Sequence, residues 1–105
     1  MKRLRPYAAS PAIQRKIEEE HQVSFEELEE AFARNPLLLR GETDQYGERR
    51  YLALGATESG RRLLTVFTVS TPGRAKVITA RQMSSSEQRL YRSKRKHDKR
   101  QRNNN

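Results

Sequence analysis

Three side chains near the end of the chain have the chemistry needed to handle a phosphate group. Arg81 closes a strand-like run, and Glu87 and Tyr91 follow at an i, i+4 spacing that places both on one stripe of a helix. Arg81 can bind a phosphate while Glu87 or Tyr91 moves a proton. In a structural alternative, Glu87 completes a helix cap, Tyr91 packs on the sheet and Arg81 pairs with Glu87. Capping boxes and strand-end ion pairs are common, so the spacing alone favours this alternative.

Further cations lie at the beginnings of two predicted strands, as the pairs Arg49-Arg50 and Arg61-Arg62. Side chains alternate along a strand, so each pair sends one arginine to each face of a sheet. Together with Lys76 or Arg81 they can form a positive patch, and a solvated sheet face is the alternative. The same alternation predicts that Lys76 and Arg81 point to opposite faces, unless a bulge intervenes.

His21 is the candidate general base, because histidine titrates near neutral pH. The alternative is a residue that caps or packs the end of the first predicted helix. We predict neither a metal site nor another cofactor. The second histidine, His97, is distant in sequence, cysteine is absent, and the aspartates are only Asp44 and Asp98.

The elements that must position these residues begin with two helices. Ser10-Pro11 predicts an N-cap followed by proline at the first helical position, for a helix that ends near His21. Ser24 and Glu27 predict a capping box for a second helix, which Asn35-Pro36 ends.

Four segments then have the composition of strands, residues 37–40, 48–55, 62–69 and 74–81. The third is apolar on both faces, as expected of a central strand, and short turns between the segments favour an antiparallel meander. Ser84 and Glu87 form a second capping box, which opens a last helix. The order predicts an α+β domain with two N-terminal helices, a three- or four-stranded antiparallel sheet and a C-terminal helix.

The net charge of +9 is segregated along the 105-residue chain. Residues 1–16 carry +5 (five basic, no acidic), residues 17–48 carry −8 (two basic, ten acidic), and residues 49–105 carry +12 (fifteen basic, three acidic). This segregation predicts a face that binds a polyanion, and nucleic acid fits best. The length fits one domain, residues 10–92, between a basic N-terminal segment, residues 1–9, and a basic tail, residues 93–105, which is disordered or extends the last helix.

Neither a signal peptide nor an apolar stretch of about 20 residues, the length that spans a membrane, is found. The absence of cysteine gives no support to an oxidising compartment. We therefore expect a cytoplasmic protein without a membrane partner.

In their order along the chain, several motifs resemble those of the BrnT family, the ribonuclease toxins of type II toxin-antitoxin modules. HQVSFEE at residues 21–27 is similar to the family's KHGVSFEEA. AKVITAR at 75–81, followed by SSSEQRLY at 84–91, is similar to its RIISAR and A-x-x-x-E-R-x-x-Y. Two further motifs lie between these two. One is Glu48-Arg49 before a strand ending at Gly55, and the other is Gly60-Arg61-Arg62-Leu63 before the central strand. The resemblance covers about residues 10–92.

The resemblance implies a RelE-like fold, cleavage of RNA and neutralisation by an antitoxin encoded alongside. It nominates six residues by position: His21, Arg49, Lys76, Arg81, Glu87 and Tyr91. RNA cleavage without a metal needs a base for the 2′-hydroxyl, cations for the pentavalent phosphate and an acid for the leaving oxygen.

We assign charge stabilisation to Arg81 with Arg49 or Lys76, and RNA binding also to Arg61 and Arg62. Proton transfer falls to His21, or to Glu87 with Tyr91. His21 is preferred, because a glutamate among arginines normally has a lowered pKa.

Two other functions remain open. One is a non-catalytic RNA-binding or ribosome-associated domain that uses the basic strands and tail for backbone contacts. The other is a protein-interaction module that engages its partner through the acidic second helix and the sheet.

Overall fold

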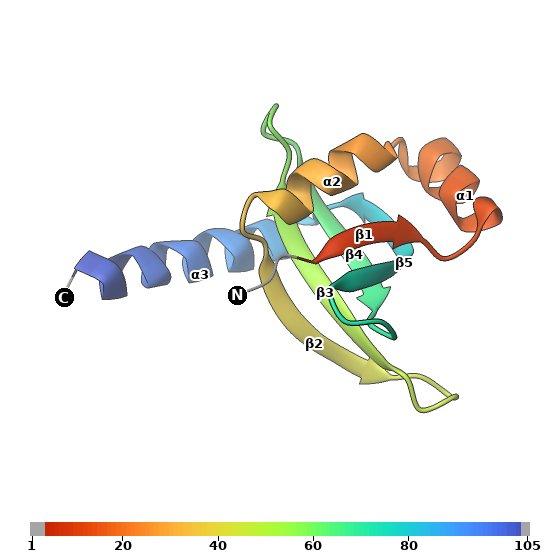
Figure 1. Ribbon diagram of the computed structural model, residues 1–105. Coiled ribbons are helices and arrows are strands. Elements are labelled where there is room, and N and C mark those ends of the chain that lie inside the picture. The colour runs from red at the N-terminus through yellow and green to blue at the C-terminus, as the bar shows by residue number, and fades with distance from the viewer. Residues whose placement is uncertain (1–3, 104–105) are drawn as a thin grey trace.

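The structure, a computed structural model, describes the backbone of residues 4–103 and the side chains of residues 4–94. Within this range, five strands form one sheet in the order β1-β5-β4-β3-β2, and three helices accompany it (Figure 1). In chain order the elements are β1 (Arg5–Ala8), α1 (Pro11–His21), α2 (Phe25–Ala33), β2 (Leu37–Thr43), β3 (Arg49–Ala56), β4 (Arg62–Thr68), β5 (Arg74–Gln82) and α3 (Ser85–Asn103).

Different helices cover the two faces of the sheet. On one face, Leu63 and Val77 share an apolar cluster with Ile17 of α1. On the other face, Leu64 clusters with Tyr91 of α3. Leu63 and Leu64 are neighbours in β4, so the two clusters lie on opposite sides of the sheet. α1 and α2 thus cover one face, and α3 lies on the other against β2 and β3.

The predicted α+β class and its three helices are confirmed, but the predicted sheet is wrong in two respects. The sheet has five strands instead of three or four, and it is mixed, because β1 pairs parallel with β5, with Arg5 opposite Arg74. β1 also precedes the two N-terminal helices. Its sequence RPYA lacks apolar alternation, and Pro6 is compatible with a strand chiefly at a sheet edge, where its nitrogen needs no hydrogen-bond partner.

An extra residue in β5 determines which way Arg81 points. The register of β5 against β4 shifts at Ile78, which has no partner in that ladder. This β-bulge reverses the alternation, so that Val77 and Ala80, three residues apart, are both buried in the cluster under α1. Lys76 and Arg81 therefore lie on the same face, the α3 side, and not on the opposite faces that simple alternation predicts.

The predicted signals at the ends of α1 and α2 are confirmed. Ser10 caps α1 by accepting a hydrogen bond from its first turn (3.1 Å), and Ser24 and Glu27 exchange two bonds at the start of α2 (3.1 and 3.0 Å). α1 ends after His21, because Gln22 adopts a left-handed conformation with φ 51°. The α1–α2 turn is thereby fixed by local interactions.

α2 approaches β3 closely because residue 55 is glycine. A Cβ at this position would lie 2.8 Å from the carbonyl oxygen of Ala31 in α2. Any side chain here would push α2 off the sheet, so Gly55 sets the distance between the helix layer and the strands.

α3 begins at the second predicted capping box. The Glu87 carboxylate accepts a hydrogen bond from the Ser84 amide (2.8 Å), and the Ser84 hydroxyl accepts one from the Glu87 amide (3.2 Å). The backbone of α3 is helical to Asn103. Of the two expectations for the residues after 92, disorder or an extended helix, the described backbone fits the extended helix. Figure 1 shows this end of α3 extending away from the sheet. Across the described residues, no helix combines the length and the apolar character needed to cross a membrane.

Removal of the Ser84 side chain should weaken the start of α3. Ser84→Ala deletes the oxygen that caps the Glu87 amide, so we expect the free energy of unfolding in urea to fall by about 1 kcal/mol. Ser85→Ala is the matched control, because Ser85 is exposed and its side chain makes no hydrogen bond with described residues. Equal losses in the two variants would contradict the capping role.

Candidate functional site

Arg81 and Glu87 form a bidentate ion pair between the end of β5 and the first turn of α3. Nη1 and Nη2 of Arg81 donate to Oε1 and Oε2 of Glu87, each at 2.8 Å. Oε1 also accepts the Ser84 amide, so one carboxylate serves the ion pair and the helix cap. The Arg81 side chain is still 42% exposed, and part of its guanidinium therefore faces solvent.

The ion pair fixes the protonation state of both partners. The hydrogen bonds from Arg81, opposed by burial and assisted by the Ser84 amide, lower the pKa of Glu87 to about 2. The same bonds raise the pKa of Arg81. Glu87 is therefore a carboxylate at neutral pH, where it has no proton to donate and is a weak base.

Tyr91 lies in an apolar cluster with Leu54, Leu64 and Met83 and is only 6% exposed. The guanidinium carbon of Arg62 lies 5.7 Å from the centre of its ring. Arg81, Glu87 and Tyr91 therefore make all the contacts of the structural alternative, and a catalytic role for them remains a prediction.

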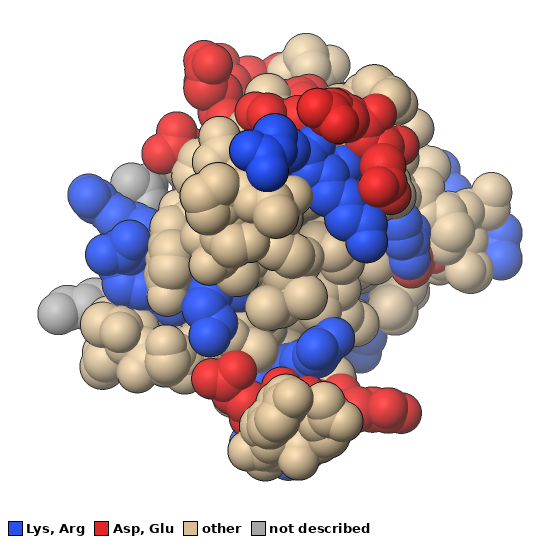
Figure 2. All heavy atoms as spheres, turned by 90° about the vertical axis from the view of Figure 1, so that its right-hand side faces the viewer, with Lys and Arg blue, Asp and Glu red and all other residues tan. Residues whose placement is uncertain are grey.

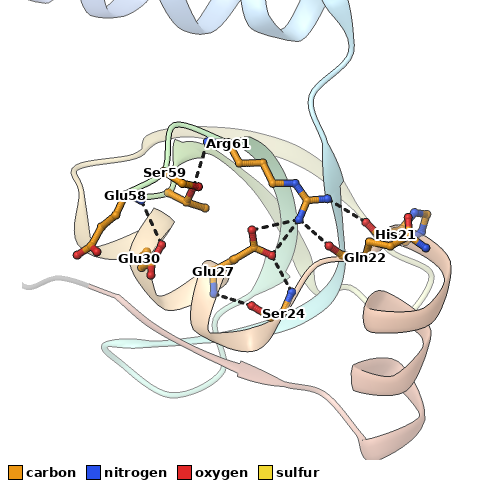
Figure 3. Close-up of polar contacts among 9 residues, drawn as sticks. His21, Gln22, Ser24, Glu27, Glu30, Glu58, Ser59 and Arg61 are labelled. Atoms are coloured by element: carbon orange, nitrogen blue, oxygen red, sulfur yellow. Dashed lines mark hydrogen bonds and ion pairs between the residues drawn. The ribbon is translucent and has the colours of Figure 1, made fainter.

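Arg61 is held on the opposite side of the sheet from Arg62. Its Nη1 donates to both carboxylate oxygens of Glu27 (2.9 and 3.1 Å) and to the Gln22 carbonyl, and Nη2 donates to the His21 carbonyl (3.3 Å). Figure 3 shows these contacts joining the β3–β4 turn to α2 and the α1–α2 turn. The prediction that the pair Arg61-Arg62 divides between the two faces is confirmed.

Glu27 supports this arrangement as a charged group. Burial works against its ionisation, but hydrogen bonds from the Ser24 amide and from Arg61 outweigh burial, and the pKa of Glu27 is lowered. The Arg61 side chain is 23% exposed, and its contacts join three segments of the fold. Arg61 is thus a structural residue, and the RNA-binding role predicted for it has little support from its contacts.

His21 lies at the same end of the sheet, beside Arg61. Its carbonyl is bound by Arg61, while its imidazole ring points away from the Arg61–Glu27 pair (Figure 3). The ring makes no hydrogen bond or ion pair with the described residues. Its nitrogens are therefore available to a substrate.

Lys76 and Arg49 lie farther from this end. Nζ of Lys76 is 3.8 Å from a carboxylate oxygen of Glu48, on the same sheet face as Arg81. Arg49 donates to the Gly41 carbonyl (3.1 Å) and belongs to the base of the β2–β3 hairpin. The structure thus groups Lys76, and not Arg49, with Arg81.

On the α3 side of the sheet, the described part of α3 packs on β2, on β3 and, through Tyr91, on Leu64 of β4, and it leaves the strip along β1, β5 and the neighbouring side chains of β4 uncovered. We call this strip the open face. Strand registers place five cations on it: Arg5, Arg62, Arg74, Lys76 and Arg81. Arg74 also stacks over the Tyr7 ring at 4.5 Å. Sequence reasoning missed Arg5 and Arg74, because their position depends on the parallel pairing of β1, which leaves no local signal.

A polar hollow with a volume of about 400 Å³ lies between the β3–β4 turn, the end of β5 and the start of α3. Its lining consists of Gly60, Arg61, Arg62, Gln82, Met83 and Gln88. The two glutamines were not singled out in the sequence, because glutamine in a helix or at a strand end has no distinctive spacing.

Acidic and basic residues occupy different parts of the surface. Figure 2 shows acidic side chains along the top, where α1 and α2 lie, and at the β2–β3 hairpin at the bottom, with lysines and arginines between and beside them. Among the described residues, no three histidine, aspartate or glutamate side chains are grouped as a metal site would require.

Residues 12–87 match the family described as the ribonuclease toxin, BrnT, of type II toxin-antitoxin systems. The chain belongs to the BrnT family. The match spans most of the sequence, from α1 through the sheet to the Arg81–Glu87 ion pair. A search of curated proteins found no match. Membership confirms the resemblance derived from the motifs and implies an antitoxin as the cognate partner of this BrnT protein.

The excess positive charge of this BrnT chain lies outside the matched residues. Residues 12–87 carry eleven basic and twelve acidic groups, a net −1. Residues 88–105 carry eight basic groups and one acid, a net +7, and residues 1–11 add +3. The matched domain is therefore nearly neutral overall, and its open face is basic because most of its acids lie on other surfaces, with only Glu48 and Glu87 of the described acids paired to cations there.

Two adjacent arginines should respond differently to the same substitution. Arg61→Gln removes the guanidinium that donates to Glu27 and to two carbonyls, so we expect the free energy of unfolding to fall by about 1–3 kcal/mol. Arg62→Gln removes only a contact with an aromatic ring, and the loss should stay below about 1 kcal/mol. Urea denaturation of both variants measures this, and equal losses would contradict a structural role specific to Arg61.

The stability contributed by Glu87 should depend on pH. A carboxylate whose folded pKa is about 2, below the ordinary 4.5, stabilises the fold above about pH 4.5 and loses that effect as the pH falls toward 2. Because Arg81 is 42% exposed, solvent screening limits the contribution to on the order of 1 kcal/mol.

Glu87→Gln should therefore be less stable than the parent at pH 7, and the difference should shrink at pH 3. The matched control is Glu29→Gln, since Glu29 is exposed and forms no ion pair with described residues. A difference for Glu87→Gln that is the same at both pH values would show that the ion pair does not stabilise the fold.

Proposed function

We propose that this BrnT protein is a metal-independent endoribonuclease that inhibits translation by cleaving RNA. The observation that carries the proposal is the open face, where a partly exposed Arg81, oriented by a bidentate ion pair, shares one side of the sheet with four further cations. A fixed guanidinium stabilises developing negative charge without having to reorganise during the reaction. Such a face suits a chain of phosphates, and an extended RNA strand is the substrate of matching shape.

The cations have different roles in this proposal. Arg81 stabilises the pentavalent phosphate, and Glu87 acts as a positioning residue that orients Arg81. Lys76 binds the RNA backbone farther along β5, since the bulge at Ile78 brings it to the same face. We do not assign charge stabilisation to Arg49, because its guanidinium donates to the Gly41 carbonyl at the β2–β3 hairpin, away from Arg81.

His21 is the group that transfers protons. Glu87 is paired and ionised, and Tyr91 is buried, whereas the His21 imidazole has no partner among the described residues. His21 is on the helix side of the sheet and Arg81 on the α3 side, so this role requires the RNA to bend around the ends of β4 and β5. The ring then removes the proton from the 2′-hydroxyl, whose oxygen attacks the phosphorus. The bond from phosphorus to the 5′-oxygen breaks, and that oxygen takes a proton from the imidazolium or from water. The products are a 2′,3′-cyclic phosphate and a free 5′-hydroxyl.

A second candidate function is RNA binding without cleavage. It is favoured by the +7 charge of residues 88–105, which lies outside the family match and needs no active site to hold RNA. Both functions give salt-sensitive binding, so turnover is the property that separates them.

Purified protein should shorten RNA in the presence of EDTA and leave 2′,3′-cyclic phosphate ends. We expect His21→Ala to slow the cleavage by about 10²-fold or more, and Arg81→Ala by about 10²- to 10³-fold. Arg15→Ala is the matched control, because Arg15 is an exposed cation of α1 that makes no hydrogen bond or ion pair with other described residues. Circular dichroism establishes that each variant is folded.

Two outcomes would overturn the proposal. Intact RNA with a salt-sensitive mobility shift would favour the binding function. Full cleavage by both folded variants would remove His21 and Arg81 from the mechanism.

A further inference from the structure

The polar hollow beside the Arg81–Glu87 pair has unused hydrogen-bonding groups on several sides. The side-chain amides of Gln82 and Gln88 make no hydrogen bond with described residues. Arg62 contacts the Tyr91 ring through its guanidinium, and its N–H groups have no acceptor among those residues. Gln82 lies opposite Leu63 and so comes from the helix side of the sheet, whereas Arg62 comes from the α3 side. The hollow is at the strand ends, where polar groups from both sides line one concave space, as is typical of a ligand site.

The other lining residues give the hollow a shape. Met83 is 6% exposed and supplies an apolar surface next to the two amides. Arg61 supplies a wall that its bonds to Glu27 and the α1–α2 turn hold in place. The volume of about 400 Å³ lies within the range of sites that bind small organic groups.

The position of the hollow relates it to the proposed chemistry. Gln82 follows Arg81 at the end of β5, and Gln88 follows Glu87 in α3. The hollow is therefore lined by a sequence neighbour of each partner in the ion pair. The Met83 amide donates to the Arg62 carbonyl (3.0 Å), which ties the two sides of the hollow together. Arg81 and Glu87 do not line the hollow themselves, so a group bound here is a neighbour of the phosphate that Arg81 is proposed to hold.

We propose that the hollow binds one unstacked guanine base of the RNA, next to the phosphate that is cleaved. The inference rests on the proposed ribonuclease function and adds a base preference to it. Proteins recognise RNA sequence mainly through splayed bases, which they bind at their edges and cover with apolar or guanidinium surfaces. Guanine offers two acceptors, O6 and N7, that match the fork of an arginine, here Arg62.

Guanine also has N–H donors on its Watson–Crick edge, and the carbonyl oxygens of Gln82 and Gln88 can accept them. Pyrimidines lack N7, and adenine has an amino group where guanine has O6. The arginine therefore supplies the preference for guanine over adenine, because its donors face the O6 acceptor in guanine and an N–H donor in adenine, whereas the two amides can bind either purine.

The preference is tested by sequencing the ends that the protein produces from a pool of RNA oligonucleotides in EDTA. The parent should enrich guanine at one position beside the cut. Arg62→Gln, which removes the guanidinium, should reduce the preference for guanine over adenine about 10-fold. Gln88→Leu, which keeps the size of the side chain and removes its amide, should lower cleavage beside both purines. Gln45→Leu in the β2–β3 hairpin is the matched control, since Gln45 is exposed and should leave the preference unchanged.

Binding of guanosine 3′-monophosphate, followed by calorimetry, separates this inference from the ribonuclease proposal. Weaker binding by Gln88→Leu, with adenosine 3′-monophosphate bound less well by the parent, would support the base site even if the parent does not cleave RNA. Cleavage with no base preference, or nucleotide binding that Gln88→Leu does not change, would overturn the base site while the ribonuclease proposal stands.

Discussion

The carboxylate of Glu87 joins the last strand to the last helix and sets the orientation of Arg81 at the same time. It closes the first turn of α3 with the Ser84 amide and accepts two bonds from Arg81 at the end of β5. A residue with this double role cannot also exchange protons at neutral pH, because both interactions favour its charged form. Much of the proposed chemistry follows from this constraint: charge stabilisation is fixed at Arg81, and proton transfer must come from another group.

The neighbouring arginines of the β3–β4 turn show how one strand divides structural and functional tasks. Arg61 points to the helix layer and bonds to three segments, so its donors are used by the fold. Arg62 points to the α3 side, where an aromatic ring is the one described group that interacts with its guanidinium. The alternation of a β-strand is sufficient to produce this division. The same residue type therefore contributes stability at one position and a free cation at the next.

Local patterns predicted a large part of this molecule. The three helices begin at the serines that the sequence marks as caps, since a cap depends on residues three apart. The division of Arg61 from Arg62 was also predictable, because it needs only the period of a strand. The α+β class followed from the order of these local signals.

Features that depend on distant partners were not predictable from one sequence. β1 is a strand because β5 provides an edge for it, and its own residues include a proline. A bulge between Lys76 and Arg81 could be allowed for but not located, since nothing in AKVITAR marks Ile78 as the unpaired residue. The polar hollow needs the β3–β4 turn and the start of α3 to meet, so Gln82 and Gln88 had no significance before the fold was known.

The separation of acidic helices from the basic open face gives the molecule an electric dipole. Seven glutamates lie on α1 and α2, whereas the cations of the open face are on the other side of the sheet. A polyanion at a distance exerts a torque on such a molecule and turns the basic side toward itself before any contact forms. The effect acts on the rate of encounter and is limited to roughly the 8 Å over which physiological salt screens charge. The nearly neutral domain can therefore approach RNA in a productive orientation although its summed charge provides little attraction.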